Sequence, residues 1–185
     1  RVVVIDHHRS VAESGVLKEV ESHFSLDNSR GGCLLAWEYL MRGRVAPEWI
    51  HLLSRYDVWD DRDPNAWRGR IVQYLAAMQA LKTDPAENSR FWQGLFSRDK
   101  GSAGEFVRDR IRDGRAILAY VEARNARTAA DHAFEARLDG LRALCVNSTF
   151  FASAALDAVW DPSRHDLMLI YARRRDGSTR VALFT

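Results

Sequence analysis

The sequence predicts an α/β protein in which a helix-rich first part with a parallel sheet is followed by a smaller β/α second part. An unbroken apolar run, Val2 to Ile5, consists of β-branched residues and is typical of a strand buried on both faces, as in a parallel sheet covered by helices. Beyond about residue 31, apolar side chains recur at the three- and four-residue spacing of helices. After about Thr128 the period changes to two, which is typical of strands. The change predicts two domains joined by a helix, with boundaries at residues 1–100, 101–127 and 128–185.

Helices fill most of the predicted first domain. Ser29 can cap a helix from about Gly31 to Met41, whose apolar residues share one face. Pro47 stands where the first turn of a helix tolerates proline, and apolar periodicity continues from there to Val58. Further helices are predicted over residues 67–81 and 85–96, and the charged stretch 101–127 is predicted to form the connecting helix.

Strands dominate the predicted second domain. They are predicted over residues 133–139, 143–146, 167–171 and 180–184, with a helix over Phe150 to Val159. Asp176-Gly177 is a hairpin turn signal. The chain begins and ends on strand-like residues, and a buried strand needs neighbours on both sides. We therefore expect a fragment that lacks sequence at both ends.

The composition is that of an ordinary folded protein and excludes several classes. The 185 residues are 46% apolar with a formal net charge of +2, which argues against disorder. The sequence has no apolar run of the roughly 20 residues that a bilayer helix needs, so we expect a cytoplasmic protein without membrane contact. Cys33 and Cys145 match no metal-ligand or disulfide spacing and are interpreted as buried thiols.

Arginine accounts for all but three of the 27 basic residues. Arginine binds phosphate with paired donors, so the bias is compatible with a phosphorylated ligand. A GC-rich genome produces the same bias, and the 25 acidic residues cancel the overall field. Nonspecific coating of nucleic acid is therefore not expected.

Asp6, His7 and His8 directly follow the first predicted strand. In open α/β sheets ligands collect at the carboxyl ends of strands, which gives these side chains a functional position. Neighbouring side chains at a strand end point to opposite sides, so we expect a division of labour. One imidazole would bind a metal, the other would face the substrate, and the carboxylate would orient a ring. The alternative is a structural histidine pair.

Asp57 lies near the end of the helix predicted to begin at Pro47. A carboxylate there opposes the helix dipole, and coordination to a divalent cation would explain its presence. The neighbouring Asp60, Asp61 and Asp63 are interpreted as solvated turn residues ahead of Pro64.

The stretch from Val2 to His8 closely resembles the signature of the DHH phosphoesterases, a family that includes RecJ-type exonucleases, nano-RNA hydrolases, cyclic-dinucleotide phosphodiesterases and manganese inorganic pyrophosphatases. Ser29 to Gly32, at the start of a predicted helix, and Arg55-Tyr56-Asp57, where the family has its last metal-binding aspartate, fit as well. The second domain is similar to the DHH-associated substrate-binding domain. The resemblance implies that residues 1–100 are the C-terminal part of a DHH domain and that 128–185 are an incomplete associated domain.

The resemblance also implies roles for individual residues. His7 would bind the second of two Mn²⁺ ions, and Asp57 would complete its coordination, with Mg²⁺, Zn²⁺ or Fe²⁺ as other ions that such ligands accept. His8 would contact the scissile phosphate or protonate the leaving group, while Asp6 would support the histidines. Ser29 and Arg180 are the expected substrate-binding residues.

Two departures from the family pattern concern the rest of the site. The earlier family motifs, a histidine with spaced aspartates and a bridging aspartate, are missing from the sequence, as is the glycine-rich histidine loop that follows the last strand. Phe184 stands where many relatives have an arginine, for which Arg180 or the run Arg173 to Arg175 could substitute. A solvated hairpin edge is the alternative interpretation of that run.

The implied activity is two-metal hydrolysis of phosphodiester bonds in short RNA or DNA oligonucleotides or small nucleotides. The alternatives are a pyrophosphatase-like hydrolase and a noncatalytic nucleic-acid-binding module. For the isolated 185 residues a folded scaffold without turnover is expected, and a homodimer is left open.

Overall fold

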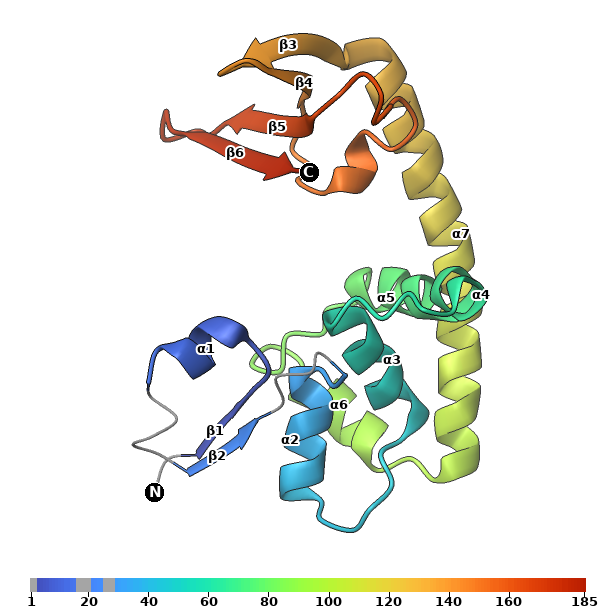
Figure 1. Cartoon of the computed structure of the whole chain (residues 1–185). Coiled ribbons are helices and arrows are strands. Elements are labelled where there is room, and N and C mark those ends of the chain that lie inside the picture. Colours follow the sequence, from blue (N-terminus) through green and yellow to red (C-terminus); the bar gives the residue numbers. More distant parts are fainter. Residues whose placement is uncertain (1–2, 16–20, 25–28) are drawn as a thin grey trace. The chain divides into compact units, whose positions relative to one another are not determined.

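The computed structural model of the chain describes residues 3–15, 21–24 and 29–185, with only the backbone described for Ala12 and for 21–24 (Figure 1). The described elements form an α/β protein. The chain divides into two compact units, Arg1–Leu118 and Ala119–Thr185. Among the described residues, no helix has both the length and the apolar character needed to cross a bilayer.

A small parallel sheet opens the first unit. Strand β1 (Val3–Asp6) pairs in parallel with β2 (Glu21–Phe24), and helix α1 (Arg9–Glu13) lies between them in the chain. The apolar run predicts a strand buried on both faces, but the side chains of β1 are only half-buried. Within the part of the chain that the structure describes, β2 is the only strand paired with β1, so the expected second neighbour is not seen.

The other described elements of the first unit are helical: α2 (Gly32–Leu40), α3 (Glu48–Asp57), α4 (Pro64–Ala66), a π-helical turn (Trp67–Ile71), α5 (Val72–Gln79), α6 (Ser89–Phe96) and the first part of α7 (Lys100–His132). Except for α4, which lies outside every predicted helix, they confirm the helices predicted from apolar spacing, with shifted ends. Pro47 is the residue before α3 rather than part of its first turn. The helix expected from residue 85 begins only at Ser89, because the Asn88 side chain accepts the Phe91 N–H and caps it there.

One apolar core holds these helices together. The centre of the core consists of fully or nearly buried residues from α2, α3, the π-helical turn, α5, α6 and α7: Leu34, Trp49, Ile50, Leu52, Ile71, Tyr74, Met78, Leu95 and Val107. Helices α5 and α7 approach closely at Gly114, where an added Cβ would lie 1.7 Å from the backbone oxygen of Gln73. A glycine in α7 therefore lets the backbones of these two helices pack directly.

The second unit contains a mixed sheet in the order β3-β4-β5-β6 (Figure 1). Its strands are β3 (Phe134–Leu138), β4 (Leu141–Asn147), β5 (Leu167–Arg173) and β6 (Thr179–Phe184). The central pair β4 and β5 is parallel, and both outer pairs are antiparallel. All four strands were expected from the sequence. The predicted hairpin turn is also present, with Gly177 at a φ of +85° and its N–H donated to the Arg174 carbonyl.

The core of the second unit lies on one face of this sheet. Leu144, Val146, Met168 and Ile170 project from β4 and β5 on that face and pack with Ala129 of α7. The opposite face buries Ala143, Cys145 and Leu167 and carries exposed apolar side chains on the outer strands.

The helix predicted over Phe150 to Val159 is wrong. The structure has only a short 3₁₀ turn, Ser153–Ala155, flanked by turns and extended backbone. The Ser148 hydroxyl accepts the Phe150 N–H, and Leu156 is fully buried against the sheet. Tertiary burial of this apolar run therefore outweighs its helical spacing.

Candidate metal centre

Asp6 organises the loop between β1 and α1. Its Oδ1 accepts hydrogen bonds from the backbone N–H of His7 at 2.6 Å, from the N–H of His8 at 3.0 Å and from the His8 ring Nδ1 at 2.6 Å. Partial burial raises the pKa of Asp6, but the His8 ring and the two backbone donors outweigh it and hold the pKa below its ordinary value. Because Nδ1 donates to a carboxylate, Nε2 is the His8 nitrogen left for a ligand. Asp6 therefore holds the His8 ring directly, and it contacts His7 at the backbone N–H of His7.

His7 lies against Asp57, although they come from different elements. His7 is buried, with 7% of its surface exposed, and its Nε2 is 3.1 Å from Asp57 Oδ2. Asp57 is the last residue of α3 and its side chain is 45% exposed. The rings of His7 and His8 contact each other at a centroid distance of 4.3 Å. The fold therefore brings together the two residues expected to share a metal ion.

The start of α2 completes this arrangement. The Gly31 N–H donates to the buried Ser54 hydroxyl at 2.8 Å, and the Gly32 N–H donates to Asp57 Oδ2 at 2.9 Å. A Cβ on Gly31 would lie 2.7 Å from Asp57 Oδ2 and 2.9 Å from the Ser54 carbonyl oxygen. The absence of a side chain at Gly31 is what lets the α2 N-terminus reach the end of α3.

The structure changes the explanation for a carboxylate at the end of α3. The sequence predicts that a cation supplies the compensating positive charge. In the structure the N-terminus of α2, which carries a partial positive charge, donates Gly32 N–H to Asp57. The position of Asp57 is therefore accounted for without a cation, although its remaining exposed surface leaves room for one.

Two overlapping groups of donors suit a divalent cation: Asp6, His7 and His8 in the loop after β1, and the pair His7 and Asp57. One ligand atom from each of Asp6, His7 and His8 lies within 4.8 Å of the others. The 3.1 Å between His7 Nε2 and Asp57 Oδ2 matches neighbouring ligands on an octahedral ion with bonds of about 2.1 Å, which lie about 3 Å apart. A hydrogen bond has the same length, so this distance suits both states. Imidazole and carboxylate ligands accept Mn²⁺, Mg²⁺, Zn²⁺ or Fe²⁺.

The other expected site residues have different surroundings. Ser29 is exposed and does not cap α2, because Gly31 is the N-cap residue and no side chain caps this helix. That expectation is wrong, since the close approach to Asp57 requires a glycine at the cap. Arg180 lies on β6 in the second unit, with its guanidinium 4.2 Å from the centre of the Phe151 ring. Substrate binding by Ser29 and Arg180 stays a prediction.

Asp60 differs from the solvated turn residue that the sequence suggests. Its carboxylate accepts from Arg62 Nε at 2.6 Å and from Arg55 Nε at 2.9 Å, and only 12% of its side chain is exposed. The hydrogen bond from Arg62, followed by that from Arg55, lowers the pKa of Asp60 to about 2 despite partial burial. Asp61 is exposed as expected, and Asp63 accepts two backbone N–H groups as the N-cap of α4.

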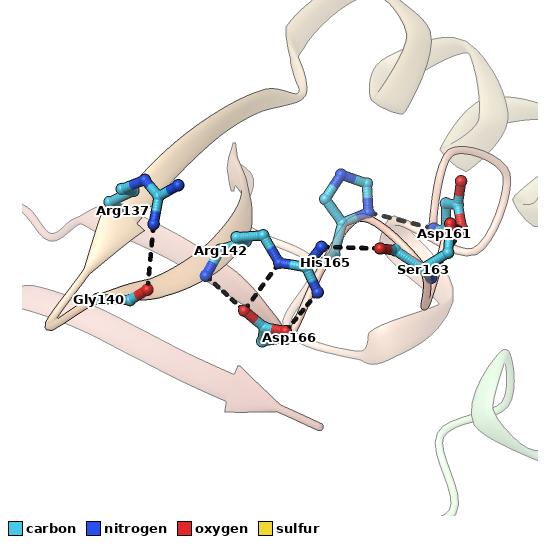
Figure 2. A network of polar contacts seen from close by, with 7 residues as sticks. All are labelled: Arg137, Gly140, Arg142, Asp161, Ser163, His165 and Asp166. Atoms are coloured by element: carbon cyan, nitrogen blue, oxygen red, sulfur yellow. Dashed lines mark hydrogen bonds and ion pairs between the residues drawn. The ribbon is translucent and has the colours of Figure 1, made fainter.

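No local sequence pattern predicts the polar network of the second unit (Figure 2). Buried His165 accepts the Asp161 N–H at Nδ1, and its Nε2 is 3.2 Å from Glu135 Oε1. Arg142 binds both carboxylate oxygens of Asp166, which lowers the pKa of Asp166 to about 2. A pocket of about 370 Å³ lies beside these residues. The ion pairs tie β3 and β4 to the loop before β5, which gives the network a structural role.

Comparison of the chain with family models, with curated proteins and with solved structures finds no match. The functional assignment therefore depends on the motif at the end of β1 and on the geometry around His7 and Asp57.

Proposed function

We propose that the protein is a metal-dependent phosphoesterase of the DHH type, which hydrolyses phosphodiester bonds in short oligonucleotides or small nucleotides. The observation that carries the proposal is the 3.1 Å contact between His7 Nε2 and Asp57 Oδ2. It joins the histidine of the signature after β1 to a carboxylate at the end of α3, the two positions at which the resemblance implies ligands of one ion.

His7 and Asp57 would hold the metal, for which Mn²⁺ is the first candidate. A bound divalent ion of this kind supplies a hydroxide nucleophile at neutral pH and neutralises charge on the phosphoryl oxygens. The hydrogen bond from Gly32 N–H orients the Asp57 carboxylate, and burial of His7 limits its ring to one direction. This chain's contribution is therefore a fixed pair of ligands from separate elements.

His8 is the residue that would act on the substrate. Its side chain is 65% exposed, so a phosphate can reach it, and Asp6 holds its Nδ1 at 2.6 Å. When the ring is protonated, its Nε2–H can pass a proton to the departing oxygen while the Asp6 carboxylate accepts from Nδ1. With a neutral ring the same nitrogen is a hydrogen-bond acceptor, so it serves both halves of a general acid–base step.

The test compares metal-linked stability with turnover in matched variants. The wild-type protein should gain thermal stability with Mn²⁺, by about 2.7 kcal/mol when free Mn²⁺ is 100 times its Kd. His7→Ala and Asp57→Asn should each lose this gain, and the same substitutions in the full-length protein should remove most hydrolysis of short oligoribonucleotides. His51→Ala is the control, because His51 is an exposed histidine on α3.

Undiminished turnover by the full-length protein carrying His7→Ala would refute the assignment. Binding of RNA that needs no metal and weakens strongly with salt would instead support the noncatalytic module. A substrate panel containing pyrophosphate and short oligonucleotides separates the phosphodiesterase from the pyrophosphatase-like hydrolase.

A further inference from the structure

The loop that follows α3 presents a tryptophan to solvent beside the candidate metal centre. Trp59 comes two residues after Asp57 and is 62% exposed. Its φ of +55° lies in the left-handed region, which bulky residues seldom adopt because the backbone energy is unfavourable. An exposed apolar ring on a backbone in an unfavourable conformation contributes little by itself to the stability of the folded chain.

Neighbouring residues fix the conformation of this loop. The Trp59 N–H donates to the Tyr56 carbonyl at 3.0 Å, and the Asp60 N–H donates to the Arg55 carbonyl at 2.8 Å. The Asp60 carboxylate joins Arg55 of α3 to Arg62 beyond the turn. The loop is therefore closed onto the end of α3, and the position of Trp59 is set before any ligand binds.

Two further rings support Trp59. Tyr56 and Trp67 are stacked almost in parallel, with centroids 5.7 Å apart and an interplanar angle of 7°. The Trp59 ring contacts Tyr56 at 5.7 Å and Trp67 at 5.1 Å, tilted by 50° and 55°. These contacts hold the indole while most of its surface stays open. A rigid, open aromatic ring is a surface on which another planar ring can stack.

We propose that Trp59 is a stacking platform for the base of a nucleotide whose phosphate lies at the candidate metal centre. The proposal rests on the proposed function and narrows its substrate class to nucleotides and oligonucleotides, since pyrophosphate has no ring to stack. Two residues of chain span at most about 7 Å, so Trp59 lies near Asp57, as a base lies near its own phosphate. Stacking accepts any base, so little sequence preference is expected.

The test measures binding of two ligands that differ only in the base. Adenosine 5′-monophosphate and ribose 5-phosphate carry the same phosphate and sugar, and their Kd values with Mn²⁺ present are measured by calorimetry. Wild-type protein should bind the nucleotide tighter by about tenfold, the usual size of one stacked base. Trp59→Ala should remove this difference, and Trp59→Phe should keep most of it.

Tyr120→Ala is the matched control, because Tyr120 is an aromatic residue of the second unit with 69% exposure. It should leave both Kd values unchanged. Two results with wild-type protein would overturn the stacking role: equal binding of the two ligands, or binding of neither. A third is that Trp59→Ala weakens both ligands equally, so that its preference for the nucleotide is the same as in wild-type and Trp59→Phe protein.

The two proposals fail in different ways. Metal-dependent binding of both ligands without a preference for the base removes the stacking platform and leaves the phosphoesterase. A base preference that persists in EDTA and in His7→Ala supports the platform and counts against the metal centre. Where neither ligand binds, comparing hydrolysis by the full-length wild-type and His7→Ala proteins still tests the phosphoesterase.

Discussion

Gly31 determines how closely two helices approach around the candidate centre. Its own φ of −75° is ordinary, so the glycine is required for space rather than for backbone freedom. The atoms around its missing Cβ belong to Ser54 and Asp57, at the end of α3. Any larger residue must push Asp57 away from His7.

Gly31→Ala should therefore lower the free energy of unfolding by about 1–3 kcal/mol, the usual cost of overpacking, and weaken the stabilisation by Mn²⁺. Urea unfolding and thermal shifts with Mn²⁺ measure the two effects. The adjacent Gly32→Ala is the control, because its Cβ would lie 4.0 Å from both Asp57 Oδ2 and His7 Cδ2, an ordinary contact. Equal losses in the two variants would contradict this role of Gly31.

Part of the site could be predicted from single residues. Histidines directly after an apolar, strand-like run and a carboxylate at a helix end are local signals, and the structure brings His7 and Asp57 together. The prediction that Ser29 caps α2 is wrong, because the residue at the cap depends on the distance between α2 and α3, which no local pattern encodes. The sequence indicates a solvated Asp60 although Arg55 and Arg62 flank it, because flanking arginines alone do not show that a turn brings the three side chains together.

At the level of elements, the spacing of apolar residues predicts the helices and strands that depend on an apolar face. Helices α2, α3 and α6 and strands β4 and β5 agree with the prediction, because each places an apolar face against a core. The outer strands β3 and β6 also agree with it, although most of their apolar side chains stay exposed. The π-helical turn Trp67–Ile71 was not expected, since its ring contacts and the fully buried Ile71 arise only in the folded unit. The helix expected over 150–159 fails for the same reason.

The contact between α5 and α7 should depend on Gly114. An alanine there would place its Cβ 1.7 Å from the Gln73 carbonyl oxygen and 3.2 Å from the Ala77 nitrogen, both of which are backbone atoms that cannot rotate away. Gly114→Ala should therefore separate the helices and cost about 3 kcal/mol or more in the free energy of unfolding. Chemical denaturation followed by helical circular dichroism measures the loss.

Gly104→Ala is the control on the same helix. Its Cβ would meet only the flexible end of Arg108 at 3.4 Å, and alanine has the higher helix propensity, so it should be neutral or stabilise the protein by up to about 1 kcal/mol. A Gly114→Ala protein as stable as Gly104→Ala would show that α5 and α7 do not need close backbone contact.

On the scale of the whole chain, two separate cores share one helix. Val107 of α7 lies in the core of the first unit, and Ala129 of the same helix lies in the core of the second. The candidate ligands His7 and Asp57 both belong to the first unit, whereas Arg180 belongs to the second. Metal binding and the expected contact with Arg180 are therefore separable properties of the chain.

Hydrogen exchange should show this separation. Free Mn²⁺ at 100 times its Kd should slow exchange by up to about 100-fold at amides that exchange through opening of the first unit, most clearly at the end of β1, the start of α2 and the end of α3. Amides of β4 and β5 should be unchanged, because no proposed ligand lies in the second unit. The protection should vanish in His7→Ala and persist in His51→Ala. Mn²⁺ protection of β4 and β5 that survives His7→Ala would locate the metal in the second unit and contradict the assignment of His7 and Asp57.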